Sequence, residues 1–203
     1  MPRVDHPYRL RGPEPTPGAV LLVVAVEEET VGLPAGASVV VTGAGKVNAA
    51  VGTTAACLAL RPGLVVNVGT AGALVGGLAG THEVGEVRQH DLDDEALHRL
   101  TGRHVGPPLR LGPGPVLVTG DVFVTGGPLR DRLVAAGAAL VDMEGYAVAR
   151  AARALGVPVR LVKHVSDGAD EHAARDWPAT VAACSRALGA WCEEHLPVHP
   201  RGA

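Results

Sequence analysis

Long apolar segments are absent from this sequence of 203 residues. No apolar run reaches the roughly 18 residues that a membrane-spanning helix requires, so we expect no membrane segment. Residues 1–17 are rich in proline and contain no apolar stretch of the kind found in secretory signals. We predict that they form a flexible leader, ordered only where it packs on the body of the protein.

Cysteine is also scarce. The three cysteines, Cys57, Cys184 and Cys192, are an odd number and have no metal-ligand spacing. This pattern favours free, buried thiols in a reducing compartment, and hence a cytoplasmic protein. The nine histidines include no i, i+4 pair followed by a third ligand, the arrangement that a zinc site needs. We therefore expect no metal.

Aromatic residues make up 2% of the chain, only two of the basic residues are lysines, and isoleucine is missing. The skew indicates a compositional bias of the source genome, so Ala-rich or Arg-rich stretches carry no functional weight by themselves. The net charge of −3 gives no electrostatic reason to expect nucleic acid or an anionic membrane as a partner.

Apolar runs that alternate with helical segments make up the rest of the chain. A continuous apolar run is typical of a strand buried on both faces, and strand–helix alternation favours parallel pairing. The sequence therefore predicts one α/β domain over residues 18–203. Predicted strands cover 20–26, 38–42, 64–68, 84–89, 116–119, 139–141 and 157–165, and predicted helices cover 46–60, 93–100, 128–136, 144–155 and 173–196.

Two acidic motifs lie at positions where an α/β fold commonly carries reactive or ligand-binding residues. Asp142-Met143-Glu144-Gly145 lies at a predicted helix start, and Ser166-Asp167 follows the last predicted strand. Ligands of open α/β sheets bind at the carboxyl ends of the strands, so an Asp at that point is well placed to react. The alternative is that these acids cap the helix and the following turn.

Three further segments invite a functional interpretation, and each has a structural alternative. Residues 67–72, Asn-Val-Gly-Thr-Ala-Gly, offer small residues that a flat ligand could approach, or form a tight turn. The run Glu27-Glu28-Glu29 could activate water, or be the acidic first turn of a helix. Phe123, the one phenylalanine, could contact a ligand or lie in the core.

Glycine-rich residues 43–46 match no phosphate-binding motif. Gly43-Ala-Gly45-Lys46 lacks the four-residue spacing and the Ser or Thr of a P-loop, and it lacks the third glycine of a dinucleotide fingerprint. We interpret it as a strand-to-helix turn.

Taken together and in their order along the chain, the Glu27–Glu29 run, residues 67–72 and the two acidic motifs resemble those of the purine nucleoside phosphorylase and nucleosidase family. Among its members, the bacterial 5′-methylthioadenosine/S-adenosylhomocysteine nucleosidases are the most similar. The resemblance extends from about Val20 to Leu196. It implies a three-layer fold with a central mixed, mostly parallel sheet flanked by helices, no cofactor, and a homodimer.

The resemblance also implies a role for each site residue. Asp167 corresponds to the acid that protonates N7 of the purine, with Ser166 orienting it, and Glu29 corresponds to the residue that holds the attacking water. Glu144 would bind the ribose hydroxyls above Met143. The remaining substrate contacts implied are Phe123 and Val124 at the base, Thr70, Ala71 and Gly72 as the backbone wall, and Trp177 as an aromatic lid. For Trp177 the alternative is an anchor for the last helix.

The predicted function is therefore hydrolysis of the N-glycosidic bond of a purine nucleoside similar to 5′-methylthioadenosine. Phosphorolysis is disfavoured, because the family's phosphate-binding arginine is replaced by Asn67 and carboxylates follow the first strand. The segment between Gly85 and Val116 is shorter than in the family and lacks the aromatic residues that cover the 5′ end of the partner's substrate. Hydrolysis of another nucleoside such as futalosine, or non-catalytic nucleoside binding, therefore remains an alternative.

Overall fold

The computed structural model of the chain describes residues 6–171 and 173–197. Residues 1–5, which belong to the predicted leader, and residues 172 and 198–203 lie outside the described residues. Within the described residues, no helix combines the length and the apolar character needed to cross a membrane.

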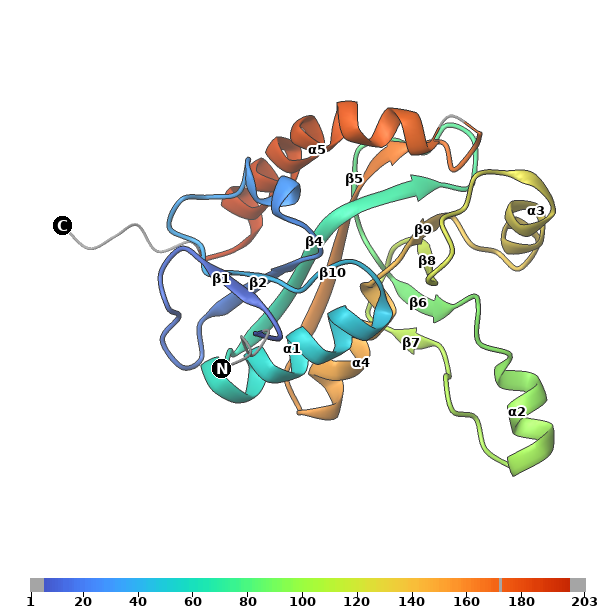
Figure 1. Ribbon diagram of the computed structural model, residues 1–203, viewed down its shortest axis with the longest axis horizontal. Helices are drawn as coiled ribbons and strands as arrows, with labels where there is room; N and C mark the ends of the chain where they lie inside the picture. The colour runs from blue at the N-terminus through green and yellow to red at the C-terminus, as the bar shows by residue number, and fades with distance from the viewer. Residues whose placement is uncertain (1–5, 172, 198–203) are drawn as a thin grey trace, which may run out of the picture.

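A mixed sheet of ten strands forms the centre of the molecule (Figure 1). The strands are β1 (Arg9–Arg11), β2 (Val20–Val24), β3 (Val39–Val41), β4 (Leu64–Ala73), β5 (Thr81–Glu83), β6 (Glu86–Gln89), β7 (Leu109–Arg110), β8 (Val116–Thr119), β9 (Leu140–Asp142) and β10 (Val159–Asp167). Five pairs are parallel: β2–β3, β2–β4, β4–β10, β6–β8 and β8–β9. Four pairs are antiparallel: β1–β3, β4–β9, β5–β10 and β6–β7.

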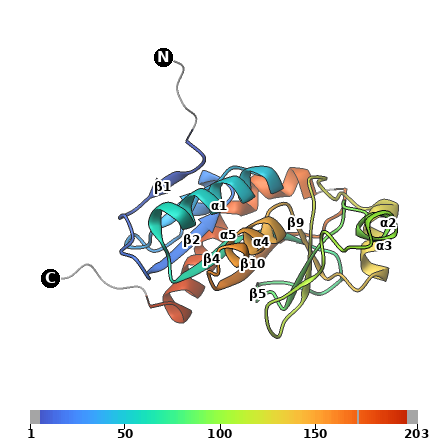
Figure 2. The same cartoon turned by 90° about the horizontal axis from the view of Figure 1, so that it is seen from below.

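Helices cover both faces of this sheet, which gives the three-layer α/β architecture that the sequence predicts. α1 and α4 lie side by side on one face, and α5 crosses the other (Figures 1 and 2). The helical segments are η1 (Glu27–Thr30, a 3₁₀ helix), α1 (Lys46–Leu60), α2 (Asp94–Thr101), α3 (Gly127–Ala135), α4 (Gly145–Ala154) and α5 (Ala173–His195).

The apolar run of β2 shows how sequence produces this layering. Successive side chains of a strand point to opposite faces. Leu21 and Val23 accordingly pack in the cluster under α1 and α4, and Leu22 and Val24 pack in the cluster under α5. A strand buried on both faces needs an unbroken apolar run, which is what the sequence contains.

Two strands extend beyond their predicted ends, and both extensions carry site residues. β4 continues to Ala73, because Thr70 to Gly72 pair with β10, and Gly72 and Ala73 pair with β9. The tight turn that the sequence left open for residues 67–72 is therefore wrong, because these residues belong to the strand. β10 continues to Asp167, with a register shift between Val165 and Asp167, so this acid is the last residue of the strand and does not follow it.

Three short strands were missed: β1, β5 and β7 lie at edges of the sheet and have two or three residues each. β1 belongs to the segment predicted as a leader. Its antiparallel pairing with β3, and the packing of Tyr8 and Leu10 on the core, order residues of this segment against the body.

α5 approaches the turn that follows η1 so closely that only glycine fits at the contact. A Cβ built on Gly189 of α5 would lie 1.8 Å from the carbonyl oxygen of Gly32. Beside this contact the Ser185 hydroxyl accepts a hydrogen bond from the Gly32 amide (2.8 Å) and donates one to the Glu29 carbonyl (2.6 Å). α5 therefore fixes the backbone from which the Glu29 side chain enters the site.

Substitution of Gly189 by alanine should destabilise the protein, although alanine is the better helix former by about 1 kcal/mol. The added methyl group must displace α5 from η1, and we expect a loss of about 2 kcal/mol or more in the free energy of unfolding. Urea denaturation measures this loss. Gly76→Ala is the matched control, because no heavy atom lies within 4 Å of the added Cβ. A Gly189→Ala variant as stable as the control would contradict the close approach.

Candidate active site

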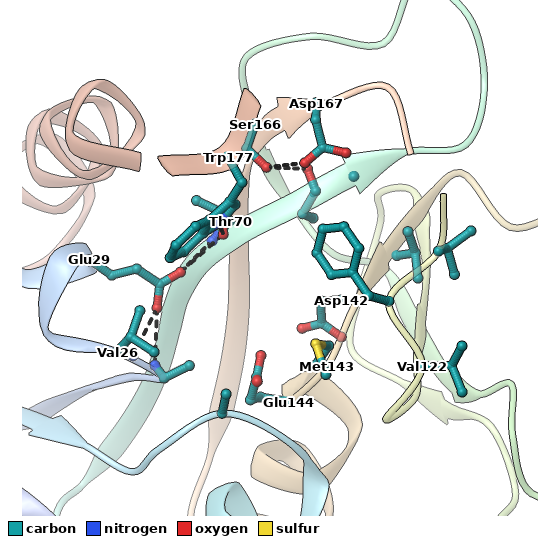
Figure 3. Close-up of a pocket in the computed structure, with 17 residues that line it drawn as sticks. Val26, Glu29, Thr70, Val122, Asp142, Met143, Glu144, Ser166, Asp167 and Trp177 are labelled. Carbon is teal, nitrogen blue, oxygen red and sulfur yellow. Dashed lines mark hydrogen bonds between the residues drawn. The ribbon is translucent and has the colours of Figure 1, made fainter. Parts of the chain in front are cut away.

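The candidate site is a cavity of about 240 Å³ beside the carboxyl ends of β4, β9 and β10. Figure 3 shows Asp167 and Ser166 at one end of it, Glu144 and Met143 at the other, and Glu29 at the side. All of the site residues predicted from the sequence line this cavity. These are Glu29, Thr70, Ala71, Gly72, Phe123, Val124, Met143, Glu144, Ser166, Asp167 and Trp177.

Glu29 is buried, with 4% of its surface exposed, and both of its carboxylate oxygens accept hydrogen bonds. Oε1 accepts from the Thr70 amide at 2.8 Å and from the Thr70 hydroxyl at 3.2 Å, and Oε2 accepts from the Ala25 amide at 3.1 Å. The neighbouring Glu27 instead forms a surface ion pair with Arg11. Within the Glu27–Glu29 run, Glu29 therefore lines the cavity, whereas Glu27 lies at the protein surface.

A buried ion pair joins Asp142, which lines the cavity, to Lys163, which does not. Lys163 of β10 places its Nζ 2.8 Å from Oδ2 of Asp142, and both side chains are almost fully buried. Burial opposes the charge of Lys163, but the carboxylates of Asp142, Glu144 and Glu29 outweigh it and raise the pKa of the lysine. Lys163 is therefore a fixed positive charge among the acids of the site.

The Asp142 side chain also bonds to the first residue of helix α4. Its Oδ2 accepts a hydrogen bond from the Gly145 amide at 2.8 Å, and its Oδ1 accepts one from the Thr119 hydroxyl at 2.6 Å. The capping role that the sequence left open for this motif thus falls to Asp142. Glu144 precedes the helix but forms no side-chain cap.

The Glu144 carboxylate is free of its own helix and faces the cavity. Its Oε1 accepts a hydrogen bond from the Gly45 amide at 2.7 Å, which ties it to the turn before α1. Burial and the negative charge of Asp142 raise the pKa of Glu144 to about 7, and Lys163 and the Gly45 amide oppose the rise. This acid therefore changes protonation state near neutral pH.

Asp167 lies at the other end of the cavity, partly exposed to solvent. Its Oδ2 accepts a hydrogen bond from the Ser166 hydroxyl at 2.7 Å, and its Oδ1 accepts one from the Ala169 amide at 2.9 Å. The bond from Ala169 is the local turn contact that the capping alternative predicts. The same carboxyl also lines the cavity. The geometry is therefore compatible both with Asp167 capping the local turn and with Asp167 acting as a reactive acid.

The loop after β8 closes the cavity with apolar side chains. Val122 and Phe123 are about half exposed, at 50% and 45%, whereas Val124 is buried. The exposure of Phe123 argues against the core alternative for this residue. Across the cavity, the Trp177 indole Nε1 donates a hydrogen bond to the Thr70 hydroxyl at 2.9 Å.

The shortened segment after β6 docks on the start of α1. Lys46 Nζ bonds to Asp91 and lies 3.4 Å from Oε1 of Gln89. Asp91 also accepts a hydrogen bond from the Asp121 amide at 2.8 Å, and Asp121 accepts one from the Lys46 amide at 2.7 Å. Asp121 thus supports the loop that carries Phe123, and Lys46 belongs to a structural turn, as the sequence indicates.

Lys163 and Thr119 are the site-supporting residues that the sequence analysis missed. Lys163 left a signal, because it is one of two lysines in the chain and directly follows apolar residues of a predicted buried strand. A buried lysine requires a carboxylate partner, so its position pointed to the acidic motifs. Thr119 left none, since a threonine at the end of a strand is ordinary.

Comparisons with known proteins agree with this geometry. The family model described as the phosphorylase superfamily matches residues 83–194, more than half of the chain. The chain belongs to the phosphorylase superfamily. A 5′-methylthioadenosine/S-adenosylhomocysteine nucleosidase of Shewanella oneidensis is 31% identical in an alignment 186 positions long, which covers 78% of this chain and 78% of the relative. The same enzyme of an Exiguobacterium species is 32% identical in an alignment 158 positions long, which covers 65% of this chain and 67% of the relative. Within the superfamily, this chain is therefore a member of the nucleosidase family.

Solved structures of the superfamily share the fold. A nucleosidase of the same name from Helicobacter pylori, in complex with a small-molecule ligand, has a TM-score of 0.76 at 21% identity and covers 88% of this chain and 97% of its own. Futalosine hydrolase of the same organism also has a TM-score of 0.76, at 22% identity, and covers 87% and 96%. The predicted family and fold class are thus confirmed.

The raised pKa of Glu144 predicts a pH dependence of stability. An acid whose pKa rises from 4.5 to about 7 on folding contributes a stability that is complete below pH 4.5 and is lost as the pH rises to about 7. For a shift of this size the loss is about 3 kcal/mol. Urea denaturation of the wild type and of Glu144→Gln between pH 4.5 and 8 should give curves that diverge over this range, with the wild type falling relative to the variant. Parallel curves would contradict the raised pKa.

Proposed function

We propose that this protein hydrolyses the N-glycosidic bond of a purine nucleoside whose 5′ group is uncharged, as in 5′-methylthioadenosine. It is a nucleosidase by family, and nucleosidases with this substrate in their name are its relatives. The observation that carries the proposal is the position of two acids at separate sides of one small cavity, Asp167 at the end of β10 and Glu29 beside η1 (Figure 3).

Asp167 is proposed as the general acid. The purine departs from C1′ with the electron pair of the C1′–N9 bond, and an anionic purine is a poor leaving group. A proton passed from the Asp167 carboxyl to N7 neutralises the departing base. The hydroxyl of Ser166 and the amide of Ala169 hold the carboxyl in place, and the purine would cover it from water.

Glu29 is proposed to hold the attacking water. The Thr70 and Ala25 amides fix both of its oxygens, so a water bound to the carboxylate has a defined position. As this water attacks C1′, it transfers a proton to Glu29. Glu144 is proposed to accept hydrogen bonds from the ribose hydroxyls, and in its ionised form it favours the positive charge that develops on the ribosyl ring.

The charge of the cavity supports water as the nucleophile. Among the described residues that line it, four are carboxylic acids, namely Glu29, Asp142, Glu144 and Asp167, and none is Arg, Lys or His. Phosphate would meet like charges and no cationic partner. The buried Asn67, at the position expected for an arginine in phosphorylases, donates its side-chain amide to the Val23 carbonyl. The same acidic lining disfavours a nucleoside with a negatively charged 5′ group, so we rank neutral 5′ substituents first.

The three cysteines are free and buried, and burial raises the pKa of each thiol. Such thiols suit a reducing compartment, which supports the proposed cytoplasmic location.

The proposed assembly is a homodimer, and an exposed apolar stripe on α1 supports it. Val47, Val51 and Leu58 lie on one face of this helix with 73%, 52% and 63% of their surfaces exposed. Sedimentation velocity should show a dimer for the wild type and a monomer for Val51→Glu, because a charge in an apolar interface is costly. A monomeric wild type would contradict the proposed homodimer but would not contradict the proposed reaction.

The reaction is tested by base release, measured by chromatography, from 5′-methylthioadenosine, S-adenosylhomocysteine, adenosine, inosine and futalosine, each with and without phosphate. We expect phosphate-independent release, with 5′-methylthioadenosine preferred. Asp167→Asn should lower kcat by at least about 100-fold, because it removes the proton donor. The matched control is Asp121→Asn, which alters a neighbouring acid outside the cavity and should change kcat by no more than a few-fold.

Two outcomes would overturn these assignments. An Asp167→Asn enzyme with wild-type turnover would remove Asp167 from the role of general acid. Nucleoside binding without base release from any of the five compounds would identify a binding protein on this fold.

A further inference from the structure

Three hydrogen bonds link helix α5 to the water-holding carboxylate. The Trp177 indole Nε1 lies 2.9 Å from the Thr70 hydroxyl, the same hydroxyl lies 3.2 Å from Glu29 Oε1, and the Thr70 amide lies 2.8 Å from that oxygen (Figure 3). The carboxylate is buried, and the hydroxyl and the indole are partly buried. The link spans three elements that are far apart in the sequence: α5, β4 and η1.

The direction of each hydrogen bond follows from chemistry. An indole N–H can only donate, so the Thr70 oxygen is the acceptor. The single hydroxyl hydrogen of Thr70 is then free to donate to Glu29, whose ionised carboxylate only accepts. The indole therefore sets the orientation of the Thr70 hydroxyl, and the hydroxyl sets the orientation of the Glu29 carboxylate. A phenylalanine at position 177 could cover the cavity but could not direct this hydroxyl.

We infer that Trp177 is a positioning residue for the nucleophilic water, acting through the Thr70 hydroxyl on Glu29. The inference rests on the proposed hydrolysis and adds a role to a residue that the sequence assigned only to a lid or to an anchor. The same helix holds the Glu29 backbone, because the Ser185 hydroxyl donates to the Glu29 carbonyl at 2.6 Å. α5 thus fixes this catalytic carboxylate at both its main chain and its side chain.

Substitutions that remove one bonding group at a time test the link. Trp177→Phe keeps an aromatic ring without the N–H, Thr70→Val keeps the shape without the hydroxyl, and Thr70→Ser keeps the hydroxyl. We expect each of the first two to lower kcat by about tenfold, the effect of one charge-assisted hydrogen bond, and to change KM by less than about threefold. Thr70→Ser should retain kcat. Trp191→Phe is the matched control on the same helix and should also retain kcat.

The double variant separates positioning from packing. If Trp177 acts through the Thr70 hydroxyl, adding Trp177→Phe to the Thr70→Val variant should lower kcat no further. The inference would be wrong if the double variant lowered kcat by the product of the two single-variant factors, or if Trp177→Phe changed KM alone. Either result would indicate that Trp177 acts as a lid. Wild-type kcat in Trp177→Phe would also overturn the inference.

A spectroscopic measurement tests the hydrogen bond independently of turnover. The chain has two tryptophans, so a ¹H–¹⁵N spectrum shows two indole signals, and Trp177→Phe identifies one of them. Thr70→Val should shift the Trp177 indole proton upfield and leave that of Trp191 in place. An unmoved Trp177 signal would show that the link is absent. A wild type that releases no base from any nucleoside would instead refute the proposed function, and the positioning role with it.

Discussion

The ion pair between Lys163 and Asp142 is the interaction on which the site depends. Four acids line a cavity of about 240 Å³, and three of them, Glu29, Asp142 and Glu144, are buried. Buried like charges repel one another strongly when water does not screen them. The ammonium of Lys163 lies 2.8 Å from Asp142 and attracts Glu144 and Glu29 as well. Loss of one partner of such a pair costs about 3–5 kcal/mol, because the other charge stays buried and uncompensated. The pair therefore makes an acidic cavity compatible with a folded protein.

Lys163 offsets only part of the negative charge of the buried acids. The proposed reaction uses the negative charge that remains. Burial and the negative charge of Asp142 raise the pKa of Glu144 to about 7, and the charge of Lys163 offsets this rise only in part. A ligand that acquires positive charge would relieve this excess of negative charge, and a ribosyl ring does so as its bond to the base breaks. An anionic nucleophile such as phosphate would add to it. One electrostatic arrangement thus supports both the rate advantage proposed for hydrolysis and the proposed preference for water over phosphate.

The sequence predicted those parts of the fold and site that depend on strong local patterns. Continuous apolar runs marked the buried strands, and the acidic motifs marked the end of the sheet where the cavity forms. Strand ends were predicted less well, because pairing with neighbours decides them. Thr70 to Gly72 look like a turn in isolation, yet they remain extended between β9 and β10. Edge strands such as β1 also escaped prediction, since two or three residues carry too little pattern. In the same way, the sequence could not assign the cap at α4 to Asp142 over Glu144, because the assignment depends on which carboxylate the Gly145 amide reaches.

Links between distant segments were out of reach of the sequence, and α5 shows what they contribute. This helix bonds to the Glu29 main chain through Ser185, to the Thr70 hydroxyl through Trp177, and to the Ser166 carbonyl through Thr180. The proposed acid and the proposed water-holding residue come from β10 and η1, which do not pair with each other, and the same helix contacts both elements. A rigid helix holds two groups in register more accurately than two independent loops, and catalytic geometry requires such accuracy. The position of Asp167 relative to Glu29 therefore depends on how α5 docks. The close contact of its Gly189 with Gly32 is thus part of the active-site architecture, although neither glycine touches the cavity.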